Sequence, residues 1–154
     1  MRVGRRLGVD VGDVRIGVAT CDPDGLIATP VETIRQGSEA IPRLVALAHE
    51  YEVIEVVVGL PVSLSGREGP AAAKVRAFAA ELAAVGPVSV RLIDERMSTM
   101  TADSQLRASG MAGHNKQSGK KRRAVIDQAA ATVILQAALD AERARNVPPG
   151  ERVK

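Results

Sequence analysis

The sequence contains very few aromatic residues. Its 154 residues include one Tyr, one Phe and no Trp. Proteins that bind single-stranded nucleic acids commonly stack the bases on aromatic side chains, and this chain has almost nothing from which to build such a platform. Any nucleic acid that it binds would therefore be recognised by its backbone and shape rather than by base identity.

Cysteine and histidine are also scarce. Cys21 is the single cysteine, so the chain cannot form an internal disulfide or offer a thiolate cluster to zinc, although Cys21 could pair with a second copy of the chain. We expect it to be a strand-end residue without a special role. His49 and His114 are the two histidines, and we expect a structural role for His49 on a helix. A zinc site is therefore not favoured.

Long apolar runs are absent as well. No run is long enough to cross a bilayer, and residues 1–6 lack the apolar segment of a signal peptide, so we expect a cytoplasmic protein without membrane contact. The length suits one domain. We place this domain at residues 1–146, followed by a disordered tail over residues 147–154 that contains Pro148, Pro149 and Gly150.

The positive charge is concentrated in one segment. The net charge is only +3, but residues 104–126 hold no acidic residue and six basic ones, namely Arg107, Lys116, Lys120, Lys121, Arg122 and Arg123. Such a cluster suits a polyanion, because each phosphate that it neutralises releases condensed counterions. The alternative is a solvated face that only keeps the protein in solution. Because the segment adjoins a candidate catalytic acid, we favour phosphate binding.

The hydrophobic pattern predicts three strands followed by alternating helices and strands. The first two strands flank a turn at Gly12-Asp13, and the third covers about residues 26–34. The later elements are a helix capped by Ser38, a nearly continuous apolar strand at 53–58, a helix at 70–86, a strand at 88–93, a short helix at 99–109 and a long helix at 121–145. This order predicts an α/β fold in which a five-stranded mixed sheet carries helices on both faces.

Four acidic residues stand at positions that suggest chemistry. Asp10 ends the first strand and Asp94-Glu95 ends the fifth, and the carboxyl ends of neighbouring parallel strands share one crevice. Asp127 interrupts an otherwise apolar stripe of the last helix, where an unpaired carboxylate would be costly. Asp94 and Glu95 would point to opposite faces of a continuous strand, so we expect only one to face Asp10, and we favour Glu95.

Converging carboxylates suit hard divalent cations such as Mg²⁺ or Mn²⁺. Two such ions can activate water and stabilise the leaving oxygen of a phosphodiester. Each acid also has a purely structural alternative. Asp10 could cap its turn, Asp94 and Glu95 could be balanced by Arg96, and Asp127 could form a salt bridge with Arg15, Arg122 or Arg123.

Four motifs in this order resemble those of the YqgF/RuvX family. They are the run from Asp10 to Ala19, Gly59-Leu60-Pro61 with Gly66 and Gly69, Asp94-Glu95-Arg96, and Asp127-Gln128-Ala129-Ala130. The family comprises bacterial RNase H-like nucleases described as pre-16S rRNA processing enzymes and Holliday junction resolvases. The departures are small: Ser63 replaces an Asn that often follows Gly-Leu-Pro, and Met97-Ser98-Thr99 replaces Leu-Thr-Thr.

The resemblance implies an RNase H-like fold and an endonuclease that uses two Mg²⁺ or Mn²⁺ ions. It implies that Asp10, the acid of the Asp-Glu-Arg motif and Asp127 bind the metal, with Arg15 and Arg96 near phosphate. The expected partner is structured RNA, such as pre-16S rRNA, or branched DNA. The sequence does not separate RNA from DNA or a monomer from a homodimer.

Three other functions share some of these sequence features. Asp10 and Gly12 before a hairpin also look like the phosphate loop of actin-like ATPases, but those enzymes close two related domains around the nucleotide, and this chain has room for one. The glycines before Lys120 miss the spacing of a Walker A loop. A non-catalytic RNA-binding module would bind through the basic segment without needing Asp10 or metal.

The loop from Gly110 to Lys120 and the basic start of the last helix are predicted to form a mobile clamp on phosphates. Three glycines disfavour a fixed conformation, and the neighbouring like charges repel one another in the absence of an anion.

Overall fold

The computed structural model describes residues 1–86, 88–98 and 119–154. The expected helix at 99–109 and most of the expected clamp, including Lys116, lie outside these residues.

A six-stranded mixed sheet forms the centre of the molecule, in the order β3-β2-β1-β4-β5-β6. The strands β1, β2 and β3 are antiparallel, β4 and β5 lie parallel to β1, and β6 is antiparallel to β5. The strand bounds are β1 Arg6–Val11, β2 Arg15–Cys21, β3 Ala28–Arg35, β4 Glu55–Leu60, β5 Ser89–Asp94 and β6 Glu151–Arg152. The helices are α1 Ala40–Glu50, α2 Pro70–Val85, the 3-10 helix η1 Glu95–Ser98 and α4 Gly119–Arg145.

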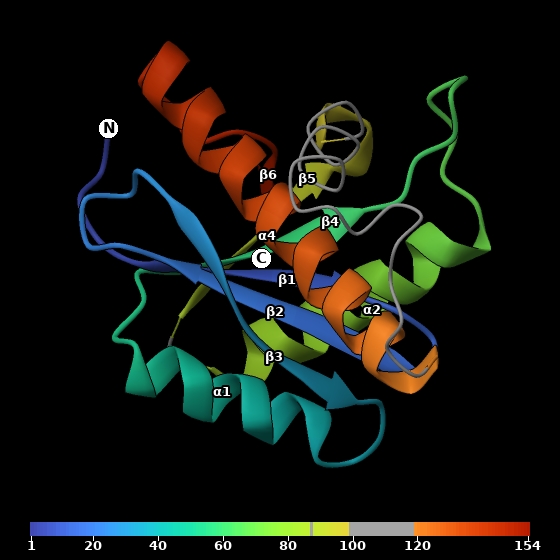
Figure 1. Ribbon diagram of the computed structural model, residues 1–154. Coiled ribbons are helices and arrows are strands. Elements are labelled where there is room, and N and C mark those ends of the chain that lie inside the picture. Colours follow the sequence, from blue (N-terminus) through green and yellow to red (C-terminus); the bar gives the residue numbers. More distant parts are fainter. Residues whose placement is uncertain (87, 99–118) are drawn as a thin grey trace.

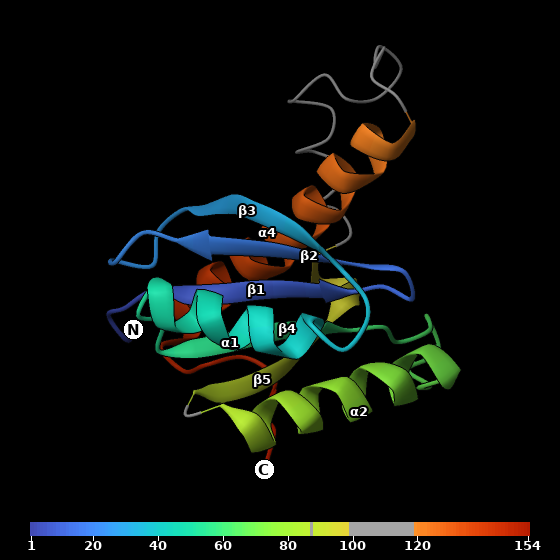
Figure 2. The ribbon, with the colours of Figure 1, turned by 90° about the horizontal axis from the view of Figure 1, so that it is seen from below.

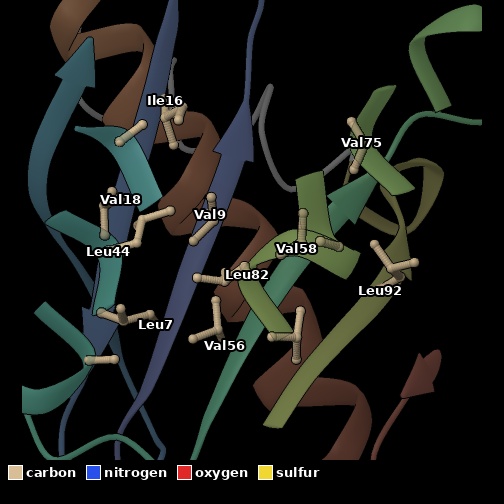
Figure 3. Packing of buried hydrophobic residues seen from close by; sticks show 14 of the residues in the cluster. Leu7, Val9, Ile16, Val18, Leu44, Val56, Val58, Val75, Leu82 and Leu92 are labelled. Carbon is tan, nitrogen blue, oxygen red and sulfur yellow. The ribbon is translucent and has the colours of Figure 1, made fainter. Parts of the chain in front are cut away.

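The expected mixed sheet with helices on both faces is confirmed, because α1 and α2 cover one face and α4 lies across the other (Figures 1 and 2). The larger core lies under α1 and α2, where Leu7, Val9, Leu44, Val58 and Leu82 pack together (Figure 3). The smaller core lies under α4 and contains Ala19, Cys21, Val57, Ile93, Ala131, Ile134, Leu135, Ala138 and Leu139, among others.

The sixth strand corrects the prediction for the tail. Residues 147–154 were expected to be disordered, yet Glu151 and Arg152 pair with Leu92 and Arg91, and the Val153 amide donates to the Val90 carbonyl at 2.8 Å. This pairing satisfies the outer edge of β5, and a local sequence pattern cannot reveal such a long-range contact. The expected five-stranded sheet therefore has six strands.

Two glycines let α4 lie close to the sheet. A Cβ on Gly8 would lie 2.6 Å from the Leu135 Cβ, and a Cβ on Gly17 would overlap the backbone oxygen of Asp127. Larger residues in β1 and β2 would push the helix away. These glycines therefore fix the height of Asp127 above the sheet.

A buried ion network holds α4 at the other end of the sheet. Glu142 accepts from Arg2 at 2.7 Å and from Arg6 at 2.9 Å, and Glu55 accepts from Arg2 at 2.9 Å and from Arg91 at 3.1 Å. Arg6, Glu55 and Glu142 are each no more than 3% exposed. Each buried charge is paired, which is the condition under which burial is tolerated.

Among the described residues, no helix is both long enough and apolar enough to cross a bilayer.

Candidate active site

The carboxyl ends of three parallel strands lie side by side at one edge of the sheet. In the register of β1, β4 and β5, Val9 pairs with Val58 and Leu60 with Asp94. Asp10 follows Val9 in β1, and Glu95 follows Asp94 at the start of η1. The strand ends that carry these acids are therefore neighbours, which is the arrangement that the sequence pattern predicts.

The alternation of strand residues decides which acids face α4. Leu7 and Val9 point into the core under α1 and α2, so Asp10 points to the α4 face. Ile93 lies in the core under α4, so Asp94 points to the opposite face, as Leu92 does. Asp94 and Asp10 are therefore not brought together.

Asp94 is instead bound by Arg96. The Arg96 guanidinium donates to both oxygens of Asp94 at distances of 2.6–3.1 Å, and the Arg96 backbone amide donates to Oδ1 at 2.9 Å. The hydrogen bonds from Arg96 hold the pKa of Asp94 below its ordinary value. The structural alternative considered for Asp94, a charge balanced by Arg96, is what the structure contains.

Asp10 and Glu95 form a hydrogen-bonded pair of carboxyl groups. Burial raises the pKa of Asp10 to about 7, and the charge of Glu95, the hydrogen bond with Glu95 and the charge of Asp127 act in the same direction. Gly59 makes room for Glu95, because a Cβ there would lie 3.1 Å from the Glu95 Cγ. One proton or one cation between the two groups would relieve their repulsion.

Asp127 completes the group from α4. Its Oδ2 accepts from the Arg15 Nε at 2.8 Å, and both side chains are partly exposed, at 32% for Arg15 and 23% for Asp127. The predicted salt-bridge alternative is thus present for Arg15. The charge of Asp127 nevertheless adds to the burial and to the effect of Glu95 that raise the pKa of Asp10.

The donor set fits a divalent cation. Carboxylate oxygens are the ligands that Mg²⁺ and Mn²⁺ prefer, and the repulsion that raises the pKa of Asp10 is the kind that a cation relieves. Within the described residues, however, no three His, Cys, Asp or Glu side chains are grouped so that they could hold a metal ion. Asp127 would have to loosen its contact with Arg15 to join the Asp10–Glu95 pair.

The predicted phosphate-binding residues are only partly placed. Arg15 lies beside Asp127, whereas Arg96 lies on the Asp94 side and also reaches the Leu64 carbonyl at 3.4 Å. Lys120, Lys121, Arg122 and Arg123 belong to the first turns of α4. Their role in binding phosphate stays a prediction.

Cys21 does not fit the possibility of an intermolecular disulfide. The thiol is 2% exposed, lies in the core under α4 and accepts a hydrogen bond from the Arg6 amide at 3.3 Å. A second copy of the chain could not reach it without opening this core.

Gly17 is a site residue to which the sequence argument gave no role. It lies directly opposite Asp10 in the β1–β2 register and directly beneath Asp127. A glycine in the middle of a strand signals close approach of another backbone, so its position was the available sign.

Comparison with known proteins identifies the family of this chain. The model of the family described as "RuvX: Holliday junction resolvase" matches residues 4–141. A protein of Streptomyces coelicolor named "Putative pre-16S rRNA nuclease" is 62% identical, with 100% of this chain and 90% of the relative covered. A relative of the same name from Thermobifida fusca is 56% identical, with 100% of this chain and 98% of the relative covered.

Solved structures show the same fold. RuvC of Thermus thermophilus in complex with a Holliday junction substrate superposes with a TM-score of 0.64 at 13% identity, covering 95% of this chain and 99% of that chain. A second structure of that RuvC has a TM-score of 0.58. The expected RNase H-like fold is thereby confirmed. The match over nearly the whole domain, together with the full-length relatives, shows that this chain belongs to the RuvX family.

Proposed function

We propose that this protein is a divalent-metal-dependent endonuclease that hydrolyses phosphodiester bonds of structured nucleic acid, and that its substrate is the 5′ end of pre-16S rRNA. The observation that carries the proposal is the buried Asp10–Glu95 carboxyl pair, with Asp127 of α4 close enough for its charge to act on Asp10. The names of the full-length relatives support the choice of rRNA. We place this activity in the cytoplasm, as the sequence predicts.

The catalytic roles follow from the environment of each carboxylate. Asp10 lies against Glu95, and burial, the charge and hydrogen bond of Glu95 and the charge of Asp127 all raise its pKa. These two groups and Asp127 would hold Mg²⁺ or Mn²⁺, which when bound supplies an activated water and charge stabilisation at the leaving oxygen. Arg15 positions Asp127 by donating to its Oδ2 at 2.8 Å.

Two further functions remain as candidates. Resolution of Holliday junctions is favoured by the description of the matching family. It would require two symmetric cuts and hence two copies of the chain, whereas trimming of an RNA end needs one. A non-catalytic RNA-binding module is the candidate of another class, and it would bind without needing Asp10.

The test compares cleavage of a pre-16S rRNA fragment and of a four-way DNA junction, each with Mg²⁺ or Mn²⁺. The variants are Asp10→Asn and, as a matched control in the adjoining turn, Asp13→Asn, whose carboxylate is 81% exposed. Metal-dependent cleavage of the RNA that Asp10→Asn abolishes and Asp13→Asn retains would support the proposal. Cleavage of the junction alone would identify a resolvase. Tight binding with no cleavage of either substrate would favour the non-catalytic module.

A further inference from the structure

The loop between β4 and α2 carries an apolar side chain that the fold does not use. Leu64 is 95% exposed, the highest value for any large hydrophobic residue in the described part of the chain. The loop, residues 61–69, projects from the end of the sheet at which β4 finishes (Figure 1, green). An isolated exposed leucine is unremarkable in itself, so its significance depends on how it is held and what lies beside it.

The turn that presents Leu64 is held by its own hydrogen bonds. The Ser63 amide donates to the Arg67 carbonyl at 3.0 Å, the Gly66 amide to the Ser63 carbonyl at 2.9 Å, and the Arg67 amide to the Ser63 Oγ at 3.1 Å. Gly66 has a φ of 89°, which favours glycine at this position of the turn. Val62, just before the turn, packs against the main core. The backbone around Leu64 is therefore already ordered in the free protein, so less conformational entropy is lost when Leu64 contacts a ligand.

The turn is also connected to the candidate active site. Arg96 donates to the Leu64 carbonyl at 3.4 Å and grips Asp94 with the same guanidinium. Asp94 is followed by Glu95, which pairs with Asp10. Leu64 is thus attached through one side chain to the strand end that carries the carboxylates, and Arg67 on the same turn is exposed.

An apolar side chain next to a phosphodiester-cutting site has a specific use. Proteins insert leucine, isoleucine, methionine or phenylalanine between base steps to unstack them, at a cost that is smallest where stacking is already interrupted. With one Tyr and one Phe in the chain, both outside this loop, Leu64 is the apolar group that the loop offers to a base.

We propose that Leu64 is a wedge that enters the nucleic acid at an unstacked base step, at a branch point or at the end of a helix, next to the bond that is cut. This inference rests on the proposed function only in requiring a nucleic-acid substrate. A wedge at Leu64 would make the enzyme selective for interrupted helices over continuous duplex, independently of base identity.

The test measures unstacking without cleavage. A 2-aminopurine is placed beside the branch of a four-way DNA junction or beside the single-strand boundary of an RNA helix with a 5′ extension, and the full chain is added with Ca²⁺ in place of Mg²⁺. The variants are Leu64→Ser, Leu64→Phe and Leu26→Ser. Leu26 is a matched control, because it is 49% exposed in the β2–β3 turn at the other end of the sheet.

We expect the wild-type protein, Leu64→Phe and Leu26→Ser to raise the fluorescence on at least one substrate, and Leu64→Ser to lose most of that rise. The affinity ratio of interrupted over continuous helix should fall about tenfold in Leu64→Ser, which corresponds to ~1.4 kcal/mol. A Leu64→Ser variant that matches the wild type, an equal loss in Leu26→Ser, or no rise with wild type on either substrate would overturn the wedge. Failure of the wild type to cleave with Mg²⁺, with the fluorescence pattern intact, would overturn the proposed function alone.

Discussion

Replacing Asp10 with Asn should change how the stability of the metal-free protein depends on pH. The pKa of Asp10 is about 7 in the folded protein and has an ordinary value of 3.8. Between these values the folded state keeps a proton that the unfolded chain releases, so the wild-type protein loses stability as the pH rises. Asn has nearly the same size and no titration, so the variant should not show this loss.

The size of the effect follows from the difference in pKa. The whole difference corresponds to about 4 kcal/mol, of which roughly 2 to 3 kcal/mol should develop between pH 5 and pH 8. The free energy of unfolding is measured by urea titration with EDTA at both pH values, for wild type, Asp10→Asn and the Asp13→Asn control. Relative to wild type, Asp10→Asn should gain stability at pH 8 and much less at pH 5, whereas Asp13→Asn should follow the wild type.

Metal provides the complementary measurement. Mg²⁺ or Mn²⁺ in place of EDTA should stabilise the wild type at pH 8 and have little effect on Asp10→Asn, because a ligand stabilises only the state that binds it. If wild type and Asp10→Asn differed by the same amount at pH 5 and pH 8, Asp10 would not be the buried, repelled acid described here. If the wild type in EDTA were the more stable at pH 8, the argument would have the wrong sign.

Three further comparisons between variants test separate parts of the site. Glu95→Gln should reduce cleavage by about 100-fold or more, because the charge that would hold the metal is lost. Asp94→Asn should cost much less, because Asp94 faces away from Asp10, and a larger loss at Asp94 would reverse the assignment. Gly17→Ala should lower the free energy of unfolding by at least about 2 kcal/mol, because its Cβ would overlap the backbone of Asp127, while Gly69→Ala, where a Cβ meets nothing within 4 Å, should be nearly neutral in urea titrations. Replacing both Lys120 and Lys121 with Ala should weaken binding of all sequences alike and reduce the salt dependence by about one unit of log-log slope per lost phosphate contact; an unchanged slope in titrations at several salt concentrations would identify a merely solubilising surface.

The strand ends and the acids at those ends could be predicted because they depend on short patterns. The alternation in β1 and the apolar positions of β5 place Asp10 and Glu95 at strand ends without any knowledge of distant contacts. The turn between β1 and β2 shows the limit of this approach. Val14 fits the apolar alternation, yet it is 59% exposed, because the Gly12 amide bonds to the Arg15 carbonyl and the strand begins only at Arg15.

The remaining features depend on pairs of residues far apart in the chain. Arg15 and Asp127 are 112 positions apart, and Arg6 and Glu142 are 136 apart. The sequence offers several Arg or Lys side chains as possible ion-pair partners for each acid, and only the fold determines which pair forms. The start of α1 also differs from the prediction. The sequence pattern predicts Ser38 as its N-cap, whereas the N-cap is Glu39, which makes no side-chain capping hydrogen bond.

The short strand β6 bears on the resistance of the protein to self-association. It covers the open edge of β5, so the amides and carbonyls of Val90 and Leu92 do not face solvent as an unpaired row. An exposed edge of this kind, flanked by apolar side chains, is a template onto which another chain can add a strand. If residues 147–154 were removed, the larger core would lose the partly buried Val153, and the backbone groups at the edge of β5 would be open to pairing with another chain. Such a shortened chain should therefore fail first by self-association on standing, before it loses its active-site geometry.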